Sequence, residues 1–243
     1  MDIQYKKIIK ERMLDDAKAH GYKLTSERPC FSRWDVASFD KYEDEYNCSY
    51  SITISYIPKD EVYLLLPSDK ITRTFKGGEE EFKSIIDEFA AYMRNEGFDA
   101  IEAVVKKPRF KIADNVYFFE NHEVLADEFC RNNDVPENAD FIDKIYYIND
   151  RINDLKGMDF ETAKPKMMAL AAYFTRIILE RGNLELVFDE IYAAIRANHS
   201  YSPIIPLTDT LLVWVGDNGA NSLKFACEQV LPREEYEAID WKI

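Results

Sequence analysis

The sequence lacks the motifs by which many enzyme classes are identified. Its 243 residues include only 8 glycines, 9 prolines, 3 histidines and 4 cysteines. Scarce glycine and proline exclude collagen-like, linker-like and low-complexity chains. The sequence has no GxGxxG, GxxxxGK[ST] or GxSxG motif, which removes the common phosphate-binding loops and the nucleophile elbow. No apolar run approaches the roughly 20 residues that span a bilayer.

The four cysteines show no metal-binding or redox pattern. Cys30, Cys48, Cys130 and Cys227 form no CxxC, and no pair of histidines lies near them in the sequence. The N-terminal residues lack the apolar core of a signal peptide. We therefore expect reduced thiols, a cytoplasmic location, and neither a metal nor a cofactor.

Negative charge is what the chain has in excess. Lysine and arginine number 31 against 45 aspartates and glutamates, a net charge of −14. Residues 1–120 carry a net −4 and residues 121–243 a net −10. Such a surface repels phosphate backbones and anionic lipids, so we expect neither direct nucleic-acid binding nor membrane association. The charge favours solubility, and it also suits a basic protein partner.

Hydrophobic periodicity predicts an α+β fold for the first half of the chain. Residues 48–57 alternate apolar and hydroxyl side chains, which is typical of a half-buried strand. The predicted order is an N-terminal helix, a three-stranded antiparallel meander and a packed helix, over residues 3–20, 48–57, 62–66, 70–76 and 79–97. This order resembles that of bacterial secretion chaperones, which are also acidic. Element order alone assigns the chain to no family.

Beyond about residue 121 the pattern predicts an all-helical C-terminal half. Val116–Glu120 predicts one more strand before it. Helices are predicted over 122–132, 135–156, 163–181, 184–197 and 220–231, with 207–215 a buried helix or strand. The 163–181 helix is apolar on nearly all sides, which predicts a central position. We therefore expect an α+β domain over residues 1–120, and over residues 121–243 a helical domain or the helical half of one compact unit.

An aromatic and acidic segment before the first predicted strand is the leading candidate for a binding site. Tyrosine and tryptophan supply contact area at little entropic cost, and neighbouring carboxylates attract a cationic partner. The candidate partner-binding residues here are Trp34, Asp35, Phe39, Asp40, Tyr42, Glu43, Asp44, Glu45 and Tyr46. The alternative is that the segment covers the sheet and buries its rings in an ordinary core.

A second candidate is an acidic stripe on the 135–156 helix. Asp143, Asp150 and Asp154 are spaced i, i+7 and i+11, which places them on one face. The alternative is the solvated back of an amphipathic helix, since a seam of apolar residues marks its opposite face.

The remaining polar groupings favour structural interpretations. His122, Glu123 and Asp127 suggest a metal site, but a helix start whose acids complement the dipole is the simpler interpretation. Cys130 and His199 could form a catalytic Cys–His pair only if the fold brings their side chains together. The basic cluster Lys106–Lys111 suits a surface turn better than a nucleic-acid footprint.

These observations predict a non-catalytic binding protein for a basic protein partner, acting like an immunity protein, a chaperone or a nucleic-acid mimic. No catalytic residue is assigned. The alternative is an enzyme, such as a hydrolase, with a carboxylate or metal site that no motif marks.

Overall fold

The structure is a computed structural model that describes residues 4–25, 28–30, 33–136, 138–182, 184–197, 203–216 and 219–242. Contacts between Cα atoms divide the chain into two compact units, Met1–Lys107 and Pro108–Ile243.

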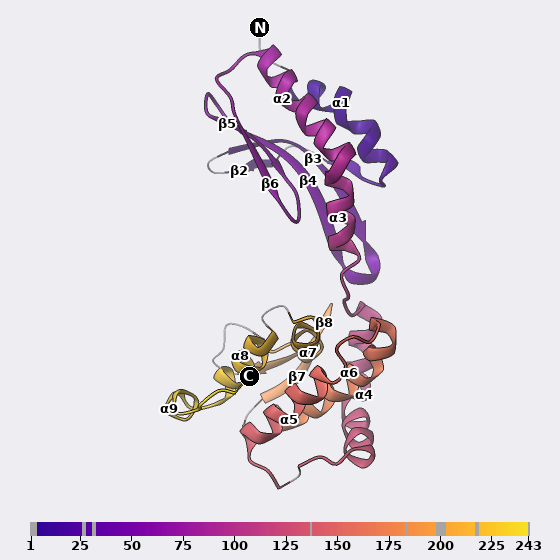
Figure 1. Cartoon of the computed structure of the whole chain (residues 1–243), viewed down its shortest axis with the longest axis vertical. Coiled ribbons are helices and arrows are strands. Elements are labelled where there is room, and N and C mark those ends of the chain that lie inside the picture. Colours follow the sequence, from indigo (N-terminus) through magenta and orange to yellow (C-terminus); the bar gives the residue numbers. More distant parts are fainter. Residues whose placement is uncertain are drawn as a thin grey trace. The chain divides into compact units, whose positions relative to one another are not determined.

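The first unit is an antiparallel sheet with helices against one face (Figure 1). Its elements are α1 (Tyr5–Ala19), β1 (Lys23–Thr25), β2 (Arg28–Cys30), β3 (Arg33–Glu43), the 3₁₀ turn η1 (Asp44–Tyr46), β4 (Cys48–Ile57), β5 (Glu61–Leu65), β6 (Lys70–Thr74), α2 (Glu79–Tyr92), the π-helical turn η2 (Met93–Gly97) and α3 (Phe98–Val105). Among the described residues the strand order is β1-β3-β4-β5-β6, and β2 also pairs with β3. The predicted meander, β4-β5-β6, is confirmed as part of this larger sheet.

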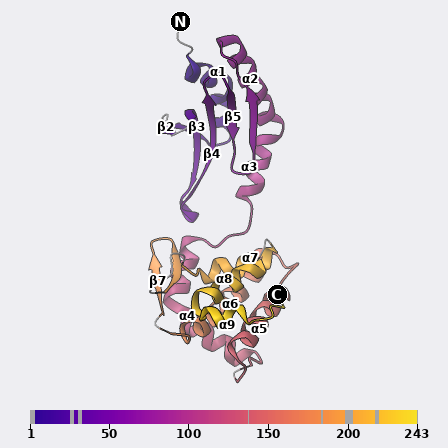
Figure 2. The same cartoon turned by 90° about the vertical axis from the view of Figure 1, so that its left-hand side faces the viewer.

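The period-2 alternation of the central strands decides which face of the sheet is buried. Phe39 of β3, Ile52 and Ile54 of β4 and Leu64 of β5 are at most 1% exposed and share one core with Phe82 of α2. Burial of each such side chain contributes roughly 1.5–3 kcal/mol. Helices α1 and α2 lie side by side over this face in both views (Figures 1 and 2).

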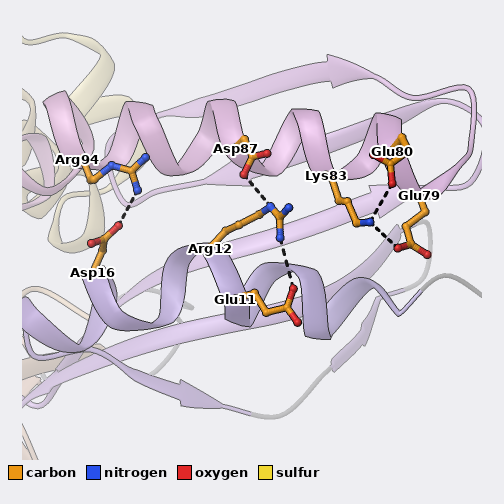
Figure 3. A network of polar contacts seen from close by, with 8 residues as sticks. All are labelled: Glu11, Arg12, Asp16, Glu79, Glu80, Lys83, Asp87 and Arg94. Carbon is orange, nitrogen blue, oxygen red and sulfur yellow. Dashed lines mark hydrogen bonds and ion pairs between the residues drawn. The ribbon is translucent and has the colours of Figure 1, made fainter.

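Ion pairs join the two helices outside that core, as Figure 3 shows. Arg12 Nε lies 2.7 Å from Asp87 Oδ1, which links α1 to α2. Arg94 Nη1 lies 2.9 Å from Asp16 Oδ2, which links η2 to α1. Such pairs are worth at most about 1 kcal/mol each, so they align helices that the apolar core already holds.

The helix predicted over residues 79–97 does not end at Gly97. The φ of Gly97 is −64°, and the chain continues through η2 into α3. A Cβ at this position would lie 2.5 Å from Met93 Sδ, which itself belongs to the core. A larger residue at this position would therefore require the Met93 side chain to move, and Gly97 does not act as a helix stop.

The second unit is mostly helical. Its elements are α4 (Ile112–Asn132), α5 (Phe141–Asn153), α6 (Phe160–Leu179), β7 (Leu184–Asp189), β8 (Tyr192–Ala197), α7 (Pro206–Val215), α8 (Gly219–Val230) and α9 (Arg233–Glu237). The central position predicted for the 163–181 helix is confirmed, because α6 is buried over most of its surface. None of the described helices combines the length and the apolarity that crossing a membrane requires.

Three predictions for this unit are wrong in detail. Val116–Glu120 lies inside α4 rather than in a strand, because buried positions recur there at helical spacing. Residues 184–197 form the hairpin β7-β8 rather than a helix, turning at Glu190 with a φ of 52°. The second half is therefore not all-helical. The helix predicted from residue 135 begins later, where the Asp140 side chain accepts a hydrogen bond from the Asp143 N–H at 2.9 Å.

The boundary between the units falls at Lys107/Pro108, ahead of the expected position after residue 120. The difference follows from α4, which begins at Ile112 and carries the residues expected to form a strand. The sequence-based expectation for residues 121–243, a helical domain or the helical half of one compact unit, stays a prediction.

The buried ring of Phe39 gives a stability prediction. Replacing Phe39 by Ala leaves a cavity between the sheet and α2, so we expect a loss of about 3–5 kcal/mol from the free energy of unfolding. Hydrogen exchange of peptides from residues 48–57, followed by mass spectrometry, measures the loss of protection. Tyr42→Ala, at an exposed ring on the same strand, is the matched control and should change stability by about 0.5 kcal/mol or less. Unchanged protection in the Phe39 variant would contradict the packing.

Candidate functional site

The β3-β4 hairpin extends beyond the strand that follows it. β3 pairs with β4 as far as Glu43↔Cys48, whereas β5 pairs with β4 only over Thr53–Ile57. We call residues 39–52 the distal ribbon: the end of β3, the turn η1 and the start of β4. This segment contains four acidic residues and one lysine, a net charge of −3.

The structure separates the residues of the aromatic and acidic segment into different environments. Phe39 is fully buried in the core, so in this fold its ring is not available to a partner. Tyr42 is 56% exposed, and its hydroxyl donates a hydrogen bond to Asn47 Oδ1. Asp44 and Glu45 are exposed in η1 at the end of the ribbon. Their neighbours Glu43 and Tyr46 are half-buried.

Trp34 lies in β3, but its side chain is outside the part of the chain that the structure describes. The partner-binding roles of Trp34 and of the exposed and half-buried residues of this segment stay predictions.

Two acids of the segment are held by hydroxyl groups on the sheet face opposite the core. Asp40 accepts hydrogen bonds from Thr25 Oγ1 at 2.8 Å and from Ser38 Oγ at 2.9 Å. Asp35 accepts one from Ser55 Oγ, where β3 carries an irregularity in its register. These bonds fix the carboxylates in place, because a bond to a charged group is worth about 1.5–3 kcal/mol.

The core-facing side of the distal ribbon is also acidic at its margin. Burial raises the pKa of Tyr22 to about 12, and the carboxylates of Glu102 and Glu43 contribute to the rise. Lys41 Nζ lies 6.0 Å from the centre of the Tyr22 ring, over its face. Lys41 is the ribbon's single basic residue, and it lies over the ring of Tyr22, a residue of the same unit.

The acidic stripe predicted for the second unit lies on α5 and its C-terminal end. Asp143, Asp150 and Asp154 are all exposed, and Asp154 lies 3.4 Å from Arg151 Nη1. Beside Asp154 is an open groove of about 620 Å³ between α4, α5 and α6, with Phe129 among its apolar lining. The geometry leaves both interpretations of the stripe, docking surface and solvated helix face, in place.

The suspected metal ligands share a hollow but not a coordination geometry. His122, Glu123 and Asp127 line an indentation of about 490 Å³ between α4 and α6. Arg176 Nη2 lies 2.6 Å from Asp127 Oδ1, and His122 Nδ1 lies 2.9 Å from the Phe119 carbonyl. Within the described ranges, no group of three or more His, Cys, Asp or Glu side chains could hold a metal ion.

The other two polar groupings lie at different places. Cys130 contacts Arg176, with 3.8 Å between Sγ and Nη1, while His199 lies outside the described residues. In the basic cluster, Lys106 ends α3 and pairs with Glu102 at 2.8 Å. Lys111 precedes α4 and donates its backbone N–H to Asp114 Oδ2. The Lys106 ammonium and the Lys111 backbone N–H therefore each bind a carboxylate at a helix end.

One buried carboxyl group with a shifted pKa was not among the residues predicted from the sequence. Asp209 in α7 is only 9% exposed, and burial raises the pKa of its carboxyl to about 7. Its Oδ2 accepts a hydrogen bond from the Ile205 N–H at 3.1 Å. This bond lowers the pKa of the carboxyl, but its effect is smaller than the rise caused by burial. The signal was present in the sequence, since Asp209 is the single charged residue between positions 203 and 216.

Comparison of the chain with models of known protein families found no match, and neither did comparison with curated proteins or with solved structures.

The Asp209 carboxyl gives a pH prediction for the second unit. Because its native pKa of about 7 lies above the unfolded value, stability falls as pH rises from about 4 through 7. Asp209→Asn keeps an oxygen acceptor for Ile205 and cannot ionise. As pH rises from 4 to 8, we expect the free energy of unfolding of the variant, relative to that of the unaltered protein, to increase by up to about 4 kcal/mol. Melting temperatures across this range test the difference, and parallel profiles would refute it.

Proposed function

We propose that the protein is a non-catalytic binding protein that holds a basic protein partner, and that the distal ribbon makes the contact. The observation that carries this proposal is the end of the ribbon, where the exposed ring of Tyr42 accompanies the exposed carboxylates of Asp44 and Glu45. An aromatic ring supplies contact area at low entropic cost, and the carboxylates attract cations.

The charge of the whole chain supports the same partner class. A net charge of −14 raises the encounter rate with a basic protein through long-range attraction. The stripe on α5 supplies a second set of exposed acids, Asp143, Asp150 and Asp154, for the same kind of partner. A cytoplasmic location belongs to this proposal, and it is supported by the described cysteines, Cys48, Cys130 and Cys227, which form no disulfide.

Charge reversal at the end of the ribbon tests the proposal. The probe is a labelled decapeptide of alternating lysine and valine, and its binding is followed by fluorescence anisotropy. Replacing Asp44 and Glu45 by Lys turns attraction into repulsion at two exposed sites. We expect affinity to fall by about tenfold, which equals roughly 1.4 kcal/mol.

The comparison variant is Asp143→Lys with Asp150→Lys, which makes the same change of net charge at the other acidic surface, the stripe on α5. A larger loss of affinity in this variant than in the ribbon variant would move the binding surface to α5. An alternating glutamate and valine peptide that bound as tightly as the lysine peptide would refute a basic partner altogether.

The alternative function, a hydrolase, is favoured by the hollow that joins His122, Glu123 and Asp127. The ion pair between Asp127 and Arg176 opposes it, because it occupies one of the required carboxylates. Metal analysis of the purified protein separates the two functions, and we expect no stoichiometric metal. Metal bound at one equivalent and lost in His122→Ala, but retained in Asn121→Ala, would favour the hydrolase.

A further inference from the structure

One edge of β4 has no strand beside it in the described chain. β5 pairs with β4 only over Thr53–Ile57. The chain then turns back into β6, with the Leu66 N–H donating to the Asp69 carbonyl at 2.8 Å. Towards the hairpin end, β4 therefore pairs with β3 on one side, and no described strand pairs with it on the other.

The backbone of two serines is directed to that open edge. Ile57 pairs with Glu61, and because Pro58 follows it without an N–H, the pair is bonded through the N–H and C=O groups of Ile57 and Glu61 themselves. Successive residues of a strand direct these groups to opposite edges. Counting back in steps of two, Ser51 and Ser49 direct theirs to the β5 side, beyond the end of β5.

This edge lacks the protection that the sheet has elsewhere. β6, the edge strand beyond β5, carries Lys70 and Arg73, and Arg73 Nε is held 2.8 Å from Glu88 Oε2 of α2. Charged side chains of this kind block pairing with another chain. Ser49 and Ser51 carry no charge. Ser49 is exposed and Ser51 is half-buried.

The charge around the open edge selects the occupant. The distal ribbon has a net charge of −3, and Asp40, which is opposite Ser51 in the register with β3, is one of its acids. A second copy of this chain would bring two ribbons of −3 together, and like charges directly across strands are destabilising. A basic extended segment has the complementary charge.

We propose that an extended segment of a basic protein adds to the sheet as a strand along Ser49–Ser51 of β4. The inference rests on the proposed function and deepens it, because it states how the partner is held. Main-chain hydrogen bonds to the two serines orient the segment, and its cationic side chains lie among the ribbon's carboxylates. Strand addition to an open sheet edge is a general mode of peptide recognition.

The test compares two peptides of equal charge. The first is the decapeptide of alternating lysine and valine, and the second is the same peptide with every peptide nitrogen methylated, so that it has no main-chain donors. We expect methylation to weaken binding at least tenfold. Ser51→Pro, which removes the N–H directed to the open edge, should weaken binding of the unmethylated peptide to a similar extent. Ser51→Ala, which keeps that N–H, should leave its affinity within about twofold.

Hydrogen exchange supplies a second readout. Amides of Ser49 and Ser51 should exchange more slowly when the unmethylated peptide is bound, which simple charge attraction does not cause. Circular dichroism establishes whether Ser51→Pro folds. If it does not, the comparison of the two peptides on the unaltered protein decides the question.

Each outcome separates the two proposals. Equal affinity for both peptides, or a Ser51→Pro protein that binds like Ser51→Ala, overturns strand addition. In that case a loss on reversing Asp44 and Glu45 still supports a basic partner at the ribbon. Absence of binding to the unmethylated peptide overturns both proposals.

Discussion

Burial of one face of the sheet against α1 and α2 is the constraint on which the first unit depends. The side-chain period of a strand is two, so placing Phe39 and Ile52 in the core fixes the alternate residues of the distal ribbon's strands on the opposite face. Asp40 and Ser51 therefore lie outside. A shift of one residue would bury the carboxylate and expose the rings, which makes the register of the distal ribbon a consequence of the core.

The same constraint explains why the aromatic and acidic segment divides as it does. Phe39 and Tyr42 are three residues apart on one strand, so they face opposite sides of the ribbon. The first ring becomes core, and the second becomes surface. Composition alone does not distinguish them. The distinction requires knowing that the segment is a strand, which its aromatic and acidic composition does not show.

Elements whose hydrophobic period repeats clearly could be predicted from the sequence, whereas Val116–Glu120 and residues 184–197 were assigned the wrong element type. The strand over residues 48–57 and the helix over 163–181 were recognised because their patterns repeat several times. Val116–Glu120 is rich in strand-favouring residues, yet it forms part of α4, where burial of Phe118 outweighs local preference. The open edge of β4 was beyond prediction, because it depends on where β5 stops pairing and on the turn that follows it.

Charge and main-chain pairing would contribute differently to capture of a basic segment. Each exposed ion pair supplies about 0–1 kcal/mol and is screened by salt. Two serines offer four main-chain bonds at roughly 0.5–1.5 kcal/mol net each. Association itself costs an estimated 4–15 kcal/mol, which over most of that range exceeds either contribution alone. Contact with an exposed ring such as Tyr42 supplies the apolar area that main-chain bonds lack. The ribbon combines all three within fourteen residues, so that in the proposed complex charge would govern the rate of encounter and the strand edge would govern orientation.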